Sequence, residues 1–296
     1  MMTFEAWRAA GQGWFYHGHE IFVRRHGRPG PRGTLLCLHG FPTASWDWHR
    51  LWDALCARFD CVIAPDFLGF GWSDKPARHA YSVFDQATLC ETLLLEMDVS
   101  RVHILAHDFG DTVAQELLAR HEERRARGHD DLLIESCVLL NGGLFPEAHR
   151  MRPIQRLLLT PLGFLLSRLG NERQFHRSFS AILGPKTQAT AQELHEFWLL
   201  NACKDGKNIM HKLLGYIPER RRHRERWVGA LTGTGVPLRF INGPADPVSG
   251  AHMATRYREL VPNADVVMLA DHIGHYPQIE DAAGTLAAFL AFHEKN

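Results

Sequence analysis

The sequence predicts an α/β protein: a mostly parallel sheet with helices on both faces and an inserted helical cap. Over most of the chain, short apolar runs of strand length alternate with segments of helical periodicity, which is typical of parallel sheets covered on both faces. The alternation stops between Pro146 and about Arg226, where only helical segments interrupted by prolines occur, and then resumes. We therefore expect one α/β core, residues 1–145 and 228–296, carrying a helical cap at residues 146–227.

The individual elements are expected in the following order. Two short strands that turn at Gly18 open the chain, Gly13–His17 and Glu20–Arg25. Continuous apolar runs predict buried strands at Thr34–His39, Cys61–Pro65, Val102–Ala106, Ile134–Leu140, Leu238–Asn242 and Ala264–Leu269. Helical patterns cover Trp46–Arg58, Phe84–Met97, Thr112–Arg125, Ala251–Val261 and Gln278–His293. Because open α/β sheets bind ligands at the carboxyl ends of their strands, we expect the cap to cover that edge.

The composition favours a small-molecule enzyme. The hydrophobic fraction of 45% and charged fraction of 22% are ordinary for a soluble protein with a sizeable core. Formal net charge is zero, so no global field favours nucleic acid or an anionic membrane. We therefore expect a small neutral organic substrate, no nucleic-acid or membrane partner, and a monomer or homodimer.

Targeting and metal-binding signals are absent from the sequence. No basic region followed by an apolar run opens the chain, and no stretch reaches the roughly 18 apolar residues that a membrane span needs. The six cysteines form no CxxC pair, which favours reduced thiols in a cytoplasmic protein. His17, His19 and Glu20 have no fourth ligand nearby in the sequence, so we expect no zinc site there.

A strand runs directly into a helix through Ala106-His107-Asp108-Phe109-Gly110. This is the small-x-nucleophile-x-Gly spacing of a nucleophile elbow, whose sharp turn requires small residues on either side of the central one. The turn would lift the Asp108 side chain above the sheet at a helix N-terminus, where an ionised carboxylate is favoured. Alone, the pattern fits a helix-capping aspartate better than a nucleophile.

Three further landmarks favour the catalytic interpretation. His39-Gly40-Phe41-Pro42 follows a strand, and the N–H groups of Phe41 and Phe109 would form an oxyanion hole. Asp246 follows a late strand within GPADP, and His275 precedes the last helix within GHYPQIE. Asp108, Asp246 and His275 follow one another in the chain as nucleophile, acid and base. One class of hydrolytic triad has its residues in this order.

Together, HGFP, DFLGFGWSDKP, HDFGD, GPADP and GHYPQIED resemble the epoxide hydrolase and haloalkane dehalogenase branch of the α/β-hydrolases, and within it the mesoderm-specific transcript group. The resemblance runs from about Trp14 to His293. It implies Asp108 as nucleophile, His275 as general base, Asp246 as the residue that orients the base, a covalent alkyl ester, and no cofactor.

Departures from that pattern bear on the substrate. Phe109 stands where dehalogenases of this branch carry a tryptophan, and Phe41 where many carry asparagine, so two halide donors are missing. Tyr216 is the sole tyrosine between Tyr81 and Tyr257, and it would protonate an epoxide oxygen. Epoxide hydrolysis is therefore expected first. Dehalogenation with donors from Trp198 and Trp227 is second, and a non-catalytic binding role is third.

Some residues keep two interpretations. His107 either packs under the elbow or touches the substrate cavity. His272 is a rival to His275 as base, although its neighbours do not match the Gly-His pattern, and Asp271 is expected to form loop hydrogen bonds. The basic run Glu219–Arg226 is expected to be a solvated cap helix with internal ion pairs.

Overall fold

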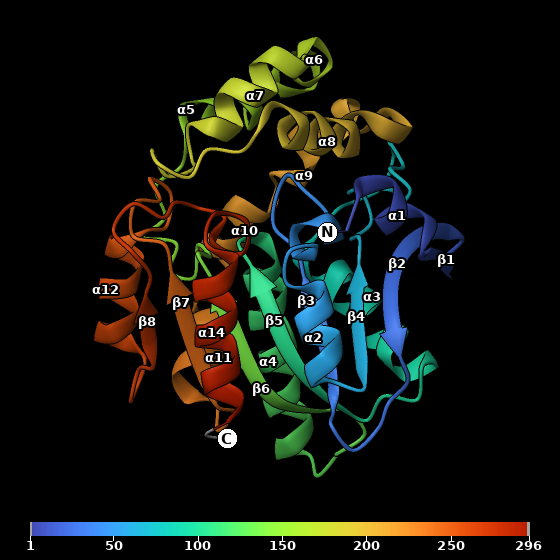
Figure 1. The fold of residues 1–296 in the computed structure, drawn as a ribbon, viewed down its shortest axis with the longest axis vertical. Helices are drawn as coiled ribbons and strands as arrows, with labels where there is room; N and C mark the ends of the chain where they lie inside the picture. The colour runs from blue at the N-terminus through green and yellow to red at the C-terminus, as the bar shows by residue number, and fades with distance from the viewer. Residues whose placement is uncertain (1, 295–296) are drawn as a thin grey trace.

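The computed structural model describes residues 2–294 and contains one eight-stranded sheet with a layer of helices above its upper edge (Figure 1). The strand order is β1-β2-β4-β3-β5-β6-β7-β8. Strands β1 and β2 pair antiparallel, β2 pairs antiparallel with β4, and all other neighbours are parallel. The strands are β1 (Gly11–Tyr16), β2 (His19–Gly27), β3 (Thr34–Leu38), β4 (Cys61–Pro65), β5 (Arg101–His107), β6 (Leu133–Leu140), β7 (Leu238–Asn242) and β8 (Val266–Met268).

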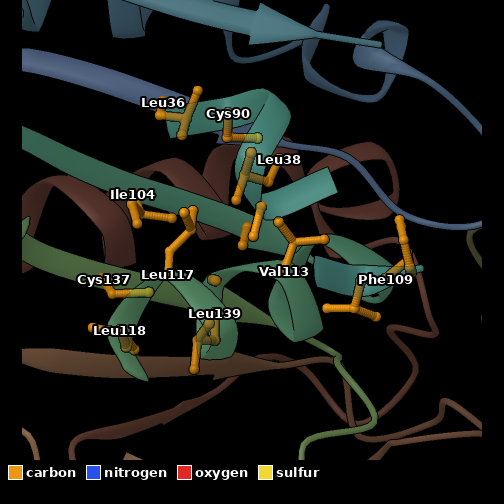
Figure 2. Close-up of a cluster of buried hydrophobic side chains, with 14 of the residues drawn as sticks. Leu36, Leu38, Cys90, Ile104, Phe109, Val113, Leu117, Leu118, Cys137 and Leu139 are labelled. Carbon is orange, nitrogen blue, oxygen red and sulfur yellow. The ribbon is translucent and has the colours of Figure 1, made fainter. Parts of the chain in front are cut away.

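Alternate residues of the central strands feed two separate cores, one on each face of the sheet. Leu36 and Leu38 of β3 contribute to one core, whereas Leu35 and Cys37 contribute to the other. Every position of β3 is therefore apolar or buried, which is why its sequence is a continuous apolar run rather than an alternating one. Figure 2 shows the first core, in which Val113, Leu117 and Leu118 of one helix meet side chains of β3, β5 and β6.

Helices cover both faces. The first core is covered by α3 (Val83–Glu96), α4 (Phe109–Ala126), α11 (Arg224–Gly233) and α12 (Ala251–Leu260). The second is covered by α1 (Phe4–Ala9), η1 (Ser45–Trp48), α2 (Trp52–Arg58), α13 (Pro277–Glu280) and α14 (Ala282–His293). The predicted α/β architecture is confirmed, with each predicted strand within a few residues of its observed bounds.

Three helical features differ from the sequence prediction. The helix α1 was not predicted; the Thr3 side chain caps it by accepting from the N–H of Ala6, and Trp7 anchors it in the second core. The predicted helix Trp46–Arg58 is divided into η1 and α2. The last helix breaks at Asp281, whose side chain accepts from the N–H of Gly284 and starts α14.

The segment between β6 and β7 is helical and lies over the carboxyl ends of the strands (Figure 1). Its elements are α5 (Pro153–Leu158), α6 (Gly163–Leu169), α7 (Glu172–Ser180), α8 (Ala191–Ala202), η2 (Cys203–Ile209), α9 (Met210–Leu213) and α10 (Tyr216–Arg222). The buried Lys75 ammonium ties the glycine-rich loop to this cap by donating to the carbonyls of Leu200 and Cys203, both at 3.1 Å. Helix α11, which also precedes β7, packs on α4 and contributes Trp227 to the first core.

No helix among residues 2–294 is long and apolar enough to cross a membrane. All six cysteines are unpaired, and Cys37, Cys61 and Cys137 are buried in β3, β4 and β6.

The turn between β5 and α4 is held by a close approach of backbones. Asp108 occupies it with a φ of 46°, a left-handed conformation that non-glycine residues adopt at some cost. Two residues later, a side chain on Gly110 would place its Cβ 2.3 Å from the carbonyl oxygen of Leu38 in β3. Only glycine lets α4 start this close to the sheet.

We expect Gly110→Ala to lower the free energy of unfolding by about 1–3 kcal/mol, because the new methyl group overpacks against fixed backbone. Urea unfolding would measure it. Gly229→Ala is the matched control: nothing lies within 4 Å of its Cβ in α11, so alanine should be neutral or stabilise by about 0.5–1 kcal/mol. Equal effects of the two substitutions would contradict the argument.

Candidate active site

The Asp108 carboxylate lies at the carboxyl edge of β5, beside the loop that follows β3. The backbone N–H of Phe41 donates to Asp108 Oδ2 at 3.2 Å. The loop is fixed from behind because the Tyr276 hydroxyl donates to the Phe41 carbonyl at 3.1 Å. Among the described residues, the N–H of Phe109 makes no such bond to the carboxylate, although Phe109 is the first residue of α4. One of the two predicted oxyanion donors is thus already in place.

His275 and Asp246 meet Asp108 from two other loops. His275 Nδ1 lies 2.7 Å from Asp246 Oδ2, and its Nε2 lies 3.9 Å from Asp108 Oδ2. All three side chains are almost fully buried. The structure therefore brings together the three residues that the sequence predicted. His272 lies elsewhere in the loop, and Asp271 is exposed.

Asp246 is held by four donors, which fixes its orientation. Besides His275, it accepts from the Asn141 amide at 2.9 Å, the Val248 N–H at 2.7 Å and the Ser249 hydroxyl at 2.8 Å. Asn141 and Ser249 were not singled out in the sequence, and no local pattern marks them. A carboxylate so saturated with donors is suited to orienting an imidazole and not to attacking a substrate.

The charges of the site stabilise one another. Burial opposes a charged imidazole, but the carboxylates of Asp246 and Asp108 outweigh it and raise the pKa of His275 to about 10. Burial also opposes ionisation of Asp108, but His275 and then Arg220 hold the pKa of its carboxyl well below the usual range. The resting site therefore holds an ionised Asp108 beside a protonated His275.

Arg220 is the residue that sequence reasoning missed. Its guanidinium is only 2% exposed and lies 3.6 Å from Asp108 Oδ1. It donates to the Asp108 carbonyl at 3.0 Å and to the Thr112 hydroxyl at 2.7 Å. Gly143 makes room for it, since a Cβ there would lie 2.2 Å from Arg220 Nη1. A cap helix thus delivers a buried cation to the predicted nucleophile.

The expectation that Glu219–Arg226 is a solvated helix with internal ion pairs is wrong. Arg224 pairs with Glu147 at 2.7 Å, and Arg226 pairs with Glu116 at 2.6 Å, both outside the run. A kink at His223 separates α10 from α11, so that Arg220 turns inward while its neighbours reach the core surface. The sequence carries no signal for this, because nothing distinguishes Arg220 from the other four arginines in these eight residues.

Tyr216 lies in the same helix as Arg220, against both residues of the predicted oxyanion hole. Its ring centroid is 5.0 Å from that of Phe109 and 5.9 Å from that of Phe41. The Arg220 guanidinium lies 4.5 Å from the ring centre. Burial and the charge of Asp108 raise the pKa of Tyr216, so the phenol keeps its proton at neutral pH.

The other residues predicted for the substrate site make structural contacts. His107 is fully buried beneath the elbow, with Nε2 2.8 Å from the His275 carbonyl, which favours the packing interpretation. Trp198 packs on Phe175 of α7, with ring centroids 5.8 Å apart. Trp227 is buried and donates its indole N–H to Glu116 at 2.8 Å. Among residues 2–294, no group of three or more His, Cys, Asp or Glu is placed to hold a metal.

Comparison with known proteins identifies the family to which the chain belongs. Residues 33–282 match the model of the alpha/beta hydrolase fold family. The chain is an α/β-hydrolase. It is 43% identical to the mesoderm-specific transcript protein of Mus musculus over 97% of this chain and 87% of that protein. It is 40% identical to the protein LipZ of Mycobacterium tuberculosis over 88% of each. The resemblance read from the motifs is confirmed.

A solved structure agrees in fold with this α/β-hydrolase. The epoxide hydrolase CorEH superposes with a TM-score of 0.74 over 96% of this chain and 98% of that one, at 18% identity. At this identity the likeness concerns the fold alone.

The raised pKa of His275 predicts the direction in which the stability of the protein changes with pH. A pKa raised from about 6.5 to about 10 on folding contributes stability that is present in full below about pH 6.5 and lost as pH rises through about 10. Asp108→Asn removes one of the two carboxylates responsible. Wild type should therefore lose stability relative to this variant between those limits, on the order of 2 kcal/mol.

Urea unfolding of both proteins across that pH range is the measurement. Asp271→Asn, at an exposed carboxyl, is the control and should follow wild type throughout. A difference between wild type and Asp108→Asn that stays constant with pH would show that the two residues are not coupled.

Proposed function

We propose that this α/β-hydrolase opens epoxides with Asp108 as nucleophile and forms a covalent alkyl ester. The observation that carries the proposal is the carboxylate at the elbow, with Phe41 N–H 3.2 Å from Oδ2 and His275 Nε2 at 3.9 Å. A carboxylate is a poor nucleophile towards esters and amides but displaces a leaving group from an sp³ carbon in a dry pocket. The residue at the elbow therefore favours alkyl transfer over acyl transfer.

In the first step, Asp108 Oδ1 attacks an epoxide carbon while Phe41 holds Oδ2. The new bond joins Oδ1 to carbon, the ring C–O bond breaks, and its electron pair stays on the ring oxygen. Tyr216 gives that oxygen a proton, and Arg220, 4.5 Å from the ring centre, stabilises the phenolate. The burial of the site strengthens these charge interactions relative to water.

Loss of the negative charge of Asp108 prepares His275 to act as the base. Ester formation removes the negative charge of Asp108, one of the two causes of the raised pKa of His275. His275 then returns a proton to the Tyr216 phenolate and becomes neutral. It can now deprotonate a water, which attacks the ester carbonyl while the Phe41 N–H stabilises the oxyanion. Hydrolysis releases the diol and restores ionised Asp108 and protonated His275.

The contacts favour epoxide over halide as the leaving group. A departing halide needs several N–H donors, and Phe41 and Phe109 have none in their side chains. The donor of Trp227 is occupied by Glu116, and Trp198 packs within the cap. A departing alkoxide needs a proton, and the phenol of Tyr216, whose ring centroid lies 5.0 Å from that of Phe109, could supply it.

His275→Gln should trap the ester, because alkylation uses Asp108 and Tyr216, whereas hydrolysis of the ester needs His275 as the base. After exposure to a reactive epoxide, intact-mass and peptide mass spectrometry should place the adduct on the peptide that contains Asp108. Asp108→Asn should form no adduct. His272→Gln is the control and should turn over normally. If His272→Gln trapped the adduct and His275→Gln did not, the base would be His272 and not His275.

Tyr216→Phe should slow alkylation by an epoxide about 10²- to 10³-fold, the usual cost of losing one oxyanion donor. Pre-steady-state mass spectrometry measures the rate. Tyr257→Phe is the matched control, since that buried phenol has no hydrogen-bond partner among the described residues and packs on Phe240 in the core. Equal rates in wild type and Tyr216→Phe would remove the phenol from the mechanism. Halide release from a chlorinated substrate without diol formation would favour dehalogenation.

A further inference from the structure

The outer helices of the cap expose an unusual number of large apolar side chains. Among the described residues, nine large hydrophobic side chains are exposed, and six of them lie within α5, α6 and the turn between them. These six, termed here the cap patch, are Ile154, Leu157, Leu162, Phe164, Leu165 and Leu169. In Figure 1, α5, α6 and α7 together form the end of the molecule farthest from the sheet.

Helix α6 exposes its large apolar residues and buries its small ones, the reverse of an ordinary surface helix. Its small residues Gly163 and Ser167 are buried and face the rest of the cap, where the N–H of His211 donates to the Ser167 hydroxyl at 3.1 Å. Its large residues Phe164, Leu165 and Leu169 face outward and are 47–64% exposed. Packing within the cap therefore gives no reason for large apolar residues at these positions, and an apolar face of this kind marks an interaction surface.

The stretch of chain that carries the cap patch is rich in positive charge, although the whole chain is neutral. Residues 150–177 contain six arginines and a single acid, Glu172, which contacts His195 at 2.6 Å. Among the described residues none of these arginines forms an ion pair, whereas Arg224, Arg226 and Arg256 elsewhere on the surface all do. The six are Arg150, Arg152, Arg156, Arg168, Arg173 and Arg177.

We propose that the cap patch docks onto the surface of an anionic phospholipid bilayer. Short amphipathic helices with leucine and phenylalanine on one face and arginines beside them lie in the plane of a membrane interface, with the apolar face among the acyl chains and the cations at the headgroups. The docking is peripheral and needs no membrane-spanning helix. It revises the expectation drawn from overall charge, because the neutral total hides an uneven distribution.

The same charges argue against a second copy of the chain as the occupant. A two-fold interface through α5 and α6 would place two sets of unpaired arginines against each other, and Glu172 is the one acid available to balance them. An anionic bilayer instead supplies the missing negative charge and the apolar phase at the same surface. The inference does not depend on the proposed catalytic activity.

Vesicle flotation tests the proposal with the full-length protein. Wild type should float with vesicles of equimolar phosphatidylcholine and phosphatidylglycerol at low salt, and much less with phosphatidylcholine alone or at high salt. The double variant Phe164→Ser with Leu165→Ser should lose flotation. The matched control is Phe15→Ser with Leu95→Ser, which removes exposed apolar side chains far from the cap patch and should change nothing.

A charge variant tests the second half of the argument. Arg156→Gln with Arg168→Gln should weaken binding to the anionic vesicles about 30-fold, since each arginine near the surface contributes about fivefold. Arg28→Gln, at an exposed arginine outside the cap, should have no effect. All variants should keep the soluble-substrate activity of wild type, which separates this test from that of the active site.

Three results would overturn the proposal. The first is failure of wild type to float with anionic vesicles. The second is equal loss in the cap-patch and control variants. The third is a concentration-dependent dimer, seen by sedimentation velocity, that the Phe164→Ser and Leu165→Ser pair abolishes; that result would assign the cap patch to a second copy of the chain.

Discussion

The buried negative charge of Asp108 is the constraint on which the rest of the site depends. A carboxylate in an apolar interior is ionised only when partners replace the lost water. Here these partners are the Phe41 N–H, protonated His275 and the Arg220 guanidinium. They come from three separate parts of the chain, so the charge is stabilised only in the complete fold. In the proposed mechanism, each of these partners responds when Asp108 loses its charge by forming the ester.

The cap is part of the site and more than a cover for it. Its helix α10 supplies both Arg220, which lies 3.6 Å from the Asp108 carboxylate, and Tyr216, which packs on Phe41 and Phe109. Lys75 fixes another part of the cap to the core loop by donating to two cap carbonyls. Docking of the cap therefore sets the electrostatics at Asp108, and a displaced α10 would leave that carboxylate with one cation fewer.

The outer and inner surfaces of the cap differ in the kinds of side chains they carry. The inner face carries buried polar contacts that serve the site, whereas the outer face of α5 and α6 combines exposed leucines with unpaired arginines. Stability of an isolated soluble protein requires neither feature. The two proposals thus assign substrate binding and surface attachment to opposite sides of one inserted segment, with the core sheet supporting both.

The sequence by itself determined the sheet, the elbow and the three residues of the predicted triad. These are encoded locally: a buried strand must be an apolar run, and the close contact of Gly110 with Leu38 leaves a glycine at a fixed spacing from Asp108. Asn141, Ser249 and above all Arg220 were decided only by the tertiary structure. Asn141 and Arg220 act through contacts across roughly a hundred residues of chain, and a kink at His223 separates the helix that carries Arg220 from the rest of the basic run. Periodicity and motif spacing report on neighbours in sequence, and burial of one charge against another is set by neighbours in space.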